Sequence, residues 1–108
     1  MSISTHVLDA VAGAPAEGMP LRLERADGSL VGTGNTNADG RCPELTEGLE
    51  LEAGVYRLRF DTGAWFARKD TTTFYPAVEL SFEVTDPAAH YHVPLLLSPF
   101  AYSTYRGS

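Results

Sequence analysis

The chain has 108 residues, the length of one domain with a single hydrophobic core, so we predict one domain over residues 1–108. Its formal net charge is −6, which argues against nucleic acid or an anionic membrane surface as a partner, because both attract clustered lysine and arginine. The single cysteine, Cys42, excludes an internal disulfide and any metal site with several thiolate ligands from one chain.

The first part of the chain predicts a strand followed by a hairpin. Side chains alternate in character over residues 3–9, which indicates a strand with two distinct faces. One face carries Ile3, Thr5 and Val7, and the other carries Ser4, His6 and Leu8. Residues 20–36 follow as a hairpin, because apolar and charged residues alternate before the turn signal Asp27-Gly28.

The second part of the chain predicts three more strands and a helix. Residues 56–60 and 78–84 alternate as strands with one wet face do, and residues 63–70 between them form a short helix. Residues 91–97 are apolar on both faces, but Pro94 interrupts the pattern because proline lacks the N–H that a sheet ladder needs. We therefore place this strand near a sheet edge and expect a second subunit to cover it.

Short strands separated by turn signals predict an all-β protein, a β-sandwich with Greek-key connections. A chain of this length buries about 65% of its unfolded surface, which leaves little room for a deep cavity. We expect any pocket to be a surface groove or a seam between subunits. The last nine residues include Phe100, Tyr102 and Tyr105, so we also expect the terminus to pack instead of fraying.

The sequence gives a simple expectation for cellular location. The first twenty residues lack the basic start and apolar segment of a secretory signal, and no apolar run approaches membrane-spanning length. The chain does not end in the peroxisomal Ser-Lys-Leu signal. We expect a soluble cytoplasmic protein without a membrane partner.

Three histidines, His6, His90 and His92, are candidates for proton transfer near neutral pH. His90 and His92 stand two residues apart on one predicted strand and share a face, and a third histidine can complete a zinc site with such a pair. Surface or hydrogen-bonded core histidines give the same pattern, and the residues alone favour that interpretation. A zinc hydrolase is an alternative that a chelator would test.

Arg41 stands between the turn-rich segment 35–40 and Cys42-Pro43. A fixed arginine there suits a planar anion, although the residues alone favour a solvated loop arginine. Cys42 receives no role, because no pairing with a histidine can be inferred. The strand arginines on presumed wet faces are expected to keep the protein soluble; they are Arg22, Arg57 and Arg59.

Several segments carry a resemblance to a known family. They are Ser4-Thr-His-Val-Leu-Asp9, Thr36-Asn-Ala-Asp-Gly-Arg41, Phe74-Tyr-Pro76 followed by Glu79-Leu-Ser-Phe82, and His90-Tyr-His-Val-Pro-Leu-Leu-Leu-Ser-Pro99. Together they resemble 5-hydroxyisourate hydrolase, the transthyretin-like enzymes of urate breakdown. The closing Tyr105-Arg-Gly-Ser108 matches that family's terminal signature, and the resemblance covers nearly the whole chain.

The resemblance implies an all-β, transthyretin-like Greek-key sandwich of two four-stranded sheets with one short helix. It implies a homotetramer, a dimer of dimers, whose active sites lie in grooves between the dimers. The implied substrate is 5-hydroxyisourate, which is hydrolysed in purine degradation to 2-oxo-4-hydroxy-4-carboxy-5-ureidoimidazoline. Neither a cofactor nor a metal ion is implied.

The resemblance also assigns roles to residues. It implies catalytic roles for His6, Arg41, His92 and Ser108, and substrate binding by His6, Arg41, Tyr105, Arg106 and Gly107. His6 and His92 transfer protons in an order that the sequence leaves open, and no role is carried to His90. The main alternative is a transthyretin-type small-molecule carrier without catalysis, which is expected to lack these groups.

Overall fold

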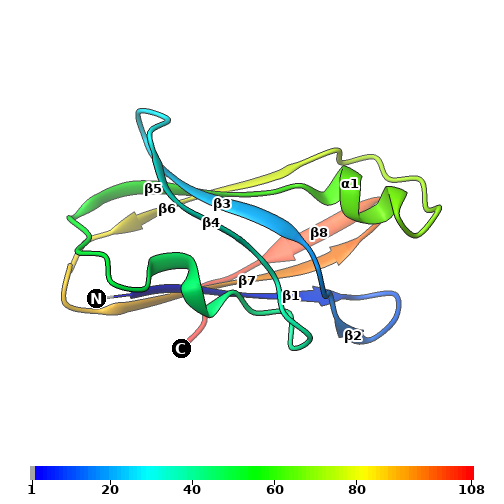
Figure 1. Ribbon diagram of the computed structural model, residues 1–108, viewed down its shortest axis with the longest axis horizontal. Coiled ribbons are helices and arrows are strands. Elements are labelled where there is room, and N and C mark those ends of the chain that lie inside the picture. Colours follow the sequence, from blue (N-terminus) through cyan, green and yellow to red (C-terminus); the bar gives the residue numbers. More distant parts are fainter. Residues whose placement is uncertain (1) are drawn as a thin grey trace.

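The computed structural model describes residues 2–108 and forms a sandwich of two four-stranded sheets (Figure 1). The first sheet has the order β2-β1-β7-β8, with bounds Ala14–Pro15, Ser2–Asp9, His90–Ser98 and Ala101–Thr104. The second sheet has the order β4-β3-β5-β6, with bounds Leu30–Asn35, Pro20–Arg25, Gly54–Phe60 and Val78–Val84. The predicted all-β sandwich is therefore confirmed, and β2 and β8 are strands that the sequence analysis missed.

Two short helices lie in the connections of the described chain. The α-helix α1 spans Thr62–Ala67. Its N-cap residue is Asp61, whose carboxylate accepts the backbone N–H of Ala64 at 3.3 Å. The 3-10 helix η1, Pro43–Thr46, follows the loop after β4. In residues 2–108, neither helix has the length and apolar character needed to cross a membrane.

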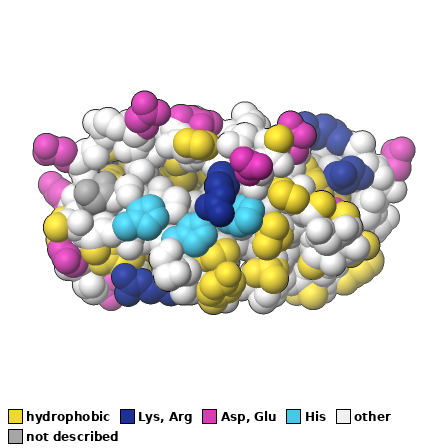
Figure 2. All heavy atoms as spheres, turned by 90° about the horizontal axis from the view of Figure 1, so that it is seen from below, with side chains coloured by type: hydrophobic (Ala, Val, Ile, Leu, Met, Phe, Trp, Pro, Cys, Tyr) yellow, Lys and Arg dark blue, Asp and Glu magenta, His cyan; other side chains and the backbone are white. Residues whose placement is uncertain are grey.

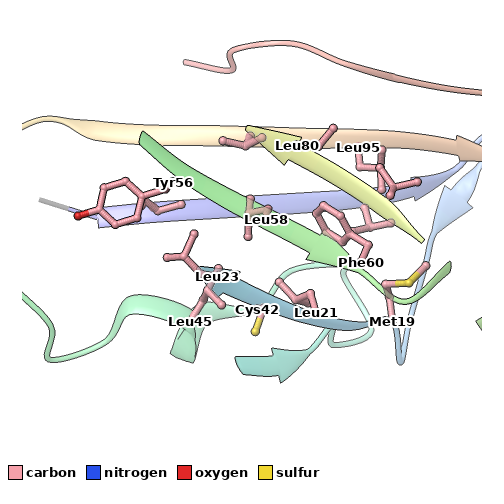
Figure 3. Close-up of a cluster of buried hydrophobic side chains, with 14 of the residues drawn as sticks. Met19, Leu21, Leu23, Cys42, Leu45, Tyr56, Leu58, Phe60, Leu80 and Leu95 are labelled. Carbon is pink, nitrogen blue, oxygen red and sulfur yellow. The ribbon is translucent and has the colours of Figure 1, made fainter. Parts of the chain in front are cut away.

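The hydrophobic core lies between the sheets and uses one face of each long strand (Figure 3). In β1 the buried residues are Ile3, Thr5 and Val7, and in β5 they are Tyr56, Leu58 and Phe60. The buried hydroxyl of Thr5 is satisfied because it donates to the carbonyl oxygen of Val93 at 2.6 Å. The predicted alternation is confirmed, and it leaves Ser4 and His6 on the outer face of the first sheet.

Strand β7 is an inner strand of the first sheet, next to the edge strand β8, and at Pro94 it has no strand partner on the β8 side, so the predicted edge position of this proline holds locally. β7 pairs with β1 in parallel, and with β8 in an antiparallel arrangement that begins at Leu95. The carbonyl oxygen of Pro94 accepts the Thr104 hydroxyl at 2.7 Å, so the nitrogen of Pro94 faces the same side of the strand. Because β8 has ended at this position, no strand partner there needs the N–H that proline lacks. The sheet therefore loses no hydrogen bond at Pro94.

The C-terminal end continues beside β7 and runs along the outer side of the first sheet (Figure 1). The N–H of Gly107 donates to the carbonyl oxygen of His92 at 2.8 Å. The side chains of Phe100 and Tyr105 are 66% and 61% exposed in the single chain. The prediction of a packed terminus thus holds for its backbone and is wrong for these two aromatic rings within one chain.

Candidate active site

An open depression of about 400 Å³ lies on the outer face of the first sheet, where four separate parts of the chain meet. Its lining residues are Ser4, His6, Arg41, His90, His92, Tyr105, Gly107 and Ser108. Figure 2 shows the three histidines gathered on this face around one Lys or Arg side chain, with hydrophobic side chains beside them. Strands β1 and β7, the loop after β4 and the C-terminal end therefore build one site.

The parallel register of β1 and β7 places the histidines. Ser4 lies opposite His92, and Ser2 lies opposite His90. His6 lies two residues further along β1 on the same face, opposite Pro94. His6 and His92 are half-buried, whereas His90 is exposed. Alternation along each strand determines which face of the sheet a side chain lies on, and the pairing register of β1 with β7 determines which side chains are neighbours. Both are needed to bring these imidazole rings together.

The hydroxyl of Ser4 lies between two imidazoles. Its oxygen is 2.7 Å from Nδ1 of His92 and 2.9 Å from Nε2 of His90. The hydroxyl of Ser2 bonds Nδ1 of His90 in turn. The two rings are stacked, with centroids 6.5 Å apart and planes inclined by 15°. Because Nδ1 of His92 is held by Ser4, Nε2 is the nitrogen of that ring that can meet a ligand.

The charge state of His92 is set by its surroundings. Burial lowers the pKa of His92 below its ordinary value, and the positive charge of Arg41 lowers it further, with smaller contributions from His90 and His6. The neutral imidazole is therefore the prevailing form near neutral pH. A neutral ring can accept a proton, as a general base must.

Arg41 reaches His6 through a tight turn. The side-chain oxygen of Asn37 accepts two backbone N–H groups of this turn, that of Arg41 at 3.0 Å among them. Gly40 accepts the backbone N–H of Val7 at 2.8 Å and has a φ of +76°, and a Cβ there would lie 2.4 Å from the oxygen of Val7. Only glycine at position 40 allows the turn to come this close to β1. The close contact joins the backbones of Arg41 and His6 in an isolated β-bridge.

The depression gathers six of the seven predicted site residues: His6, Arg41, His92, Tyr105, Gly107 and Ser108. Arg106 lies elsewhere, because its guanidinium carbon stands 4.7 Å from the ring centroid of Tyr91, whose side chain is buried. It lines a second cavity, of about 320 Å³, together with Leu80 and Phe82 of β6. This cavity is also lined by His92 and Tyr105, and the substrate contact of Arg106 stays a prediction.

The contribution of Ser4 was not predicted from the sequence, and His90 was left without a role. The available signal was the position of Ser4 on the same strand face as His6, two residues before it. That signal was incomplete, because only the register with β7 shows which residues Ser4 meets.

No cluster of three His, Cys, Asp or Glu side chains suited to a metal ion occurs within residues 2–108. The three-histidine zinc site, an alternative from sequence, therefore has no ligand set among them. The thiol of Cys42 is buried and donates to Oε1 of Glu44 at 3.2 Å. Burial and this carboxylate raise the pKa of Cys42 to about 12, so the thiol is not the activated nucleophile of a covalent mechanism.

Comparison with known proteins supplies the family. The model of the HIUase/Transthyretin family matches residues 3–107. The chain belongs to this family. The 5-hydroxyisourate hydrolase of Mus musculus is 44% identical, over 98% of this chain and 94% of that protein.

Two solved structures extend the comparison within the HIUase/Transthyretin family. The Klebsiella pneumoniae 5-hydroxyisourate hydrolase has a TM-score of 0.88 and 40% identity, over 98% of this chain and 92% of that one. Sea bream transthyretin, solved in complex with thyroxine, has a TM-score of 0.88 and 37% identity, over 97% and 93%. The predicted transthyretin-like fold is confirmed, and the fold alone does not separate hydrolase from carrier.

Proposed function

We propose that this chain is a 5-hydroxyisourate hydrolase. The observation that carries the proposal is the convergence of His6, Arg41, His92 and Ser108, which come from four separate parts of the chain, on one depression. The relatives from Mus musculus and Klebsiella pneumoniae, at 44% and 40% identity, bear that name. This grouping supports the proposal, because these are the residues that the family resemblance implies for the reaction.

The proposed reaction opens the six-membered ring of 5-hydroxyisourate. Water attacks the C6 carbonyl, the bond from C6 to N1 breaks, and one proton of the water ends on N1. The product is 2-oxo-4-hydroxy-4-carboxy-5-ureidoimidazoline, whose new carboxyl group then ionises. This chemistry needs a base for the water, a positive group for the oxyanion and an acid for the departing nitrogen.

The residues of the depression fit these three needs. His92 and His6 carry the proton transfers, and the neutral state of His92 suits it to receive a proton at Nε2. The guanidinium of Arg41 orients the planar substrate and offsets the charge on the developing oxyanion. Ser108 positions the water, while Tyr105 shapes the wall of the depression.

We propose that the working enzyme is a homotetramer, a dimer of dimers. The depression is open on one side in the single chain, and exposed apolar side chains such as Phe100 and Tyr105 lie on the segment that leads to it. A second copy packed on this face would wall the depression and exclude water. Light scattering at micromolar concentration is the test, and a monomer would contradict this assembly.

We also propose that the reaction proceeds without a metal ion. The support is that the imidazoles of His90 and His92 are engaged by serine hydroxyls, and that Arg41 supplies the positive charge that a metal would otherwise give. Turnover should then be unchanged by EDTA. Loss of turnover with the chelator, and its return with zinc, would establish the zinc hydrolase instead. The cytoplasmic location stays a prediction.

The carrier alternative rests on the likeness to sea bream transthyretin, which is 37% identical. It accounts for the fold and leaves the grouped histidines and Arg41 unexplained. The deciding experiment generates fresh 5-hydroxyisourate from urate and follows its ultraviolet decay with and without the protein. Binding without faster decay would favour the carrier.

Variants assign the roles in the same assay. His6→Ala and His92→Ala should each lower kcat by about a hundredfold or more, as loss of a positioned proton-transfer group does. Deletion of Ser108 should impair turnover more than thermal stability. Ser81→Ala is the matched control, because Ser81 is an exposed strand serine of the other sheet. If both histidine variants kept rates within a few-fold of the parent, the scheme would fail.

A further inference from the structure

The proposed reaction leaves two polar side chains of the depression unused, those of Ser4 and His90. They do not lie there as isolated groups. Ser2, His90, Ser4 and His92 form one unbroken line of hydrogen bonds from an exposed imidazole to the half-buried ring that meets the substrate. Two adjacent strands in parallel register hold all four side chains on one face.

The Ser4 hydroxyl has a single proton, and this couples the two histidines. Its oxygen lies within hydrogen-bond distance of both rings, so it donates to one nitrogen and accepts from the other. When Ser4 donates to His90, His92 donates from Nδ1 and its Nε2 carries a lone pair. When Ser4 donates to His92, the proton of neutral His92 lies on Nε2. The line therefore has two states of opposite polarity.

We infer that Ser2, His90, Ser4 and His92 form a proton relay that sets the tautomer of His92 and connects its Nε2 with solvent. This inference rests on the proposed function and deepens it. Ser4 and His90 are positioning residues that act through His92. The relay offers a reason for a second histidine beside His92, which the resemblance left without a role.

Each proton transfer at Nε2 of His92 moves four protons along the relay. When Nε2 takes a proton from water, the Nδ1 proton of His92 passes to the Ser4 oxygen and the Ser4 proton passes to Nε2 of His90. The Nδ1 proton of His90 then passes to the Ser2 oxygen, and the Ser2 proton leaves to solvent. When Nε2 gives a proton to N1, the four transfers run in reverse and solvent returns a proton to Ser2. Both rings end each step neutral.

The charges around His92 favour such a relay. The titratable and charged residues that line the depression with it are Arg41, His6, His90 and Tyr105, and Ser108 lines it as well. Burial and the charge of Arg41 lower the pKa of His92, so a proton is held poorly on that ring. His90 is exposed, and water can stabilise its positive charge. Passing the proton outward therefore moves charge from a poorly solvated ring to a solvated one.

The kinetic test removes the Ser4 hydroxyl that connects the two histidines and then restores a hydroxyl at the same position. Ser4→Ala should lower kcat by about tenfold or more while KM changes by less than about threefold, because Ser4 acts on proton transfer. Ser4→Thr keeps a hydroxyl and should retain most of kcat. Ser81→Ala, which loses a serine from the opposite sheet, should match the parent.

A chemical rescue separates proton transfer from packing. His90→Ala should lose kcat as Ser4→Ala does, and added imidazole should restore part of it in proportion to its concentration. Free imidazole can replace a missing proton acceptor, whereas it cannot repair a merely structural defect. Absence of any rescue would contradict the relay.

A substrate-free measurement distinguishes failure of the relay from failure of the proposed function. When His90 takes up a second proton, its Nε2 must donate to Ser4, which then holds His92 with its proton on Nε2. Nitrogen NMR of labelled histidine should show this coupled change in the parent and not in Ser4→Ala. Coupling without ring opening would support the relay and overturn the hydrolase. Uncoupled tautomers, or a Ser4→Ala kcat within about twofold of the parent, would overturn the relay.

Discussion

Gly107 lies directly against the imidazole of His92, and its lack of a side chain permits this contact. A Cβ at residue 107 would stand 2.4 Å from Cδ2 and 3.1 Å from Cγ of the ring. The backbone of Gly107 is fixed there, because its N–H donates to the carbonyl oxygen of His92 at 2.8 Å. The ring of His92 is thus held between the terminal segment and the hydroxyl of Ser4.

Gly107→Ala should lower kcat/KM by about tenfold or more, because the new methyl group must displace the ring that transfers protons. The free energy of unfolding should change by less than about 1 kcal/mol, since the residue lies at the end of the chain. Ring-opening rates and thermal melts measure the two effects. Ser103→Ala is the control, because Ser103 is an exposed residue of β8 that does not line the depression, and its rates should stay within about threefold of the parent. Equal rates for Gly107→Ala and the parent would contradict this account of the terminal glycine.

Asn37→Ala should weaken substrate binding through Arg41. The Asn37 side-chain oxygen accepts the backbone N–H of Arg41 at 3.0 Å and a second N–H of the same turn, so its loss frees the loop. We expect KM to rise several-fold and the free energy of unfolding to fall by about 1 kcal/mol. Asn37→Asp keeps an acceptor at the same place and should retain most of the parent's KM. A normal KM in Asn37→Ala would show that the turn holds Arg41 without this side chain.

Local pattern was enough to predict much of the fold. Alternation in β1 placed Ile3 and Val7 in the core and His6 on the other face, because side chains of a strand alternate between two environments. The same reasoning located the hairpin of β3 and β4 and the short helix α1. It placed Pro94 near a sheet edge but could not show how, because only the structure reveals that β7 is an inner strand whose partner β8 ends beside the proline.

The neighbours within the site could not be predicted from local pattern. Ser4 and His92 are 88 residues apart in sequence, and tertiary packing decides that their strands are adjacent and parallel. The approach of Arg41 to His6 depends on one backbone hydrogen bond from Val7 to Gly40. Family resemblance supplied His6, Arg41 and His92 as a set, whereas Ser4, which only the register reveals, was missed.

Glu24 gives the strand arginines a role that the sequence analysis did not expect. Its carboxylate is buried on the outer face of the second sheet, and it pairs with Nε of Arg22 and with Nη2 of Arg57, each at 2.9 Å. The sequence predicted that the strand arginines keep the protein soluble, and the structure adds this pairing for Arg22 and Arg57. They neutralise a buried charge.

Glu24→Ala should lower the free energy of unfolding by about 2 kcal/mol, because it leaves the partly buried Arg57 without its closest carboxylate. Glu79→Ala is a matched comparison, since Glu79 pairs with the same arginine from an exposed position and should cost less than about 1 kcal/mol. Urea titrations measure both. Neither variant should alter ring opening, because the depression lies on the other sheet. Equal losses of stability would show that burial of Glu24 is unimportant.

The pKa of His92 should rise when Arg41 is neutralised. Burial is the largest cause of its lowered pKa and the charge of Arg41 is the second, so Arg41→Gln should move it part of the way back to the ordinary value of 6.5. His6→Gln should cause a smaller rise, since His6 contributes least. NMR titration of labelled histidine measures each shift in the absence of substrate.

The lowered pKa of His92 also predicts how the free energy of unfolding changes with pH. Below pH 6.5 the unfolded chain binds a proton at this histidine more readily than the folded chain does. The free energy of unfolding should therefore fall as pH decreases from 6.5 to the folded pKa of His92, and this decrease should be smaller in Arg41→Gln. If His92 titrates at or above 6.5 in the parent, this pH dependence of stability would be contradicted.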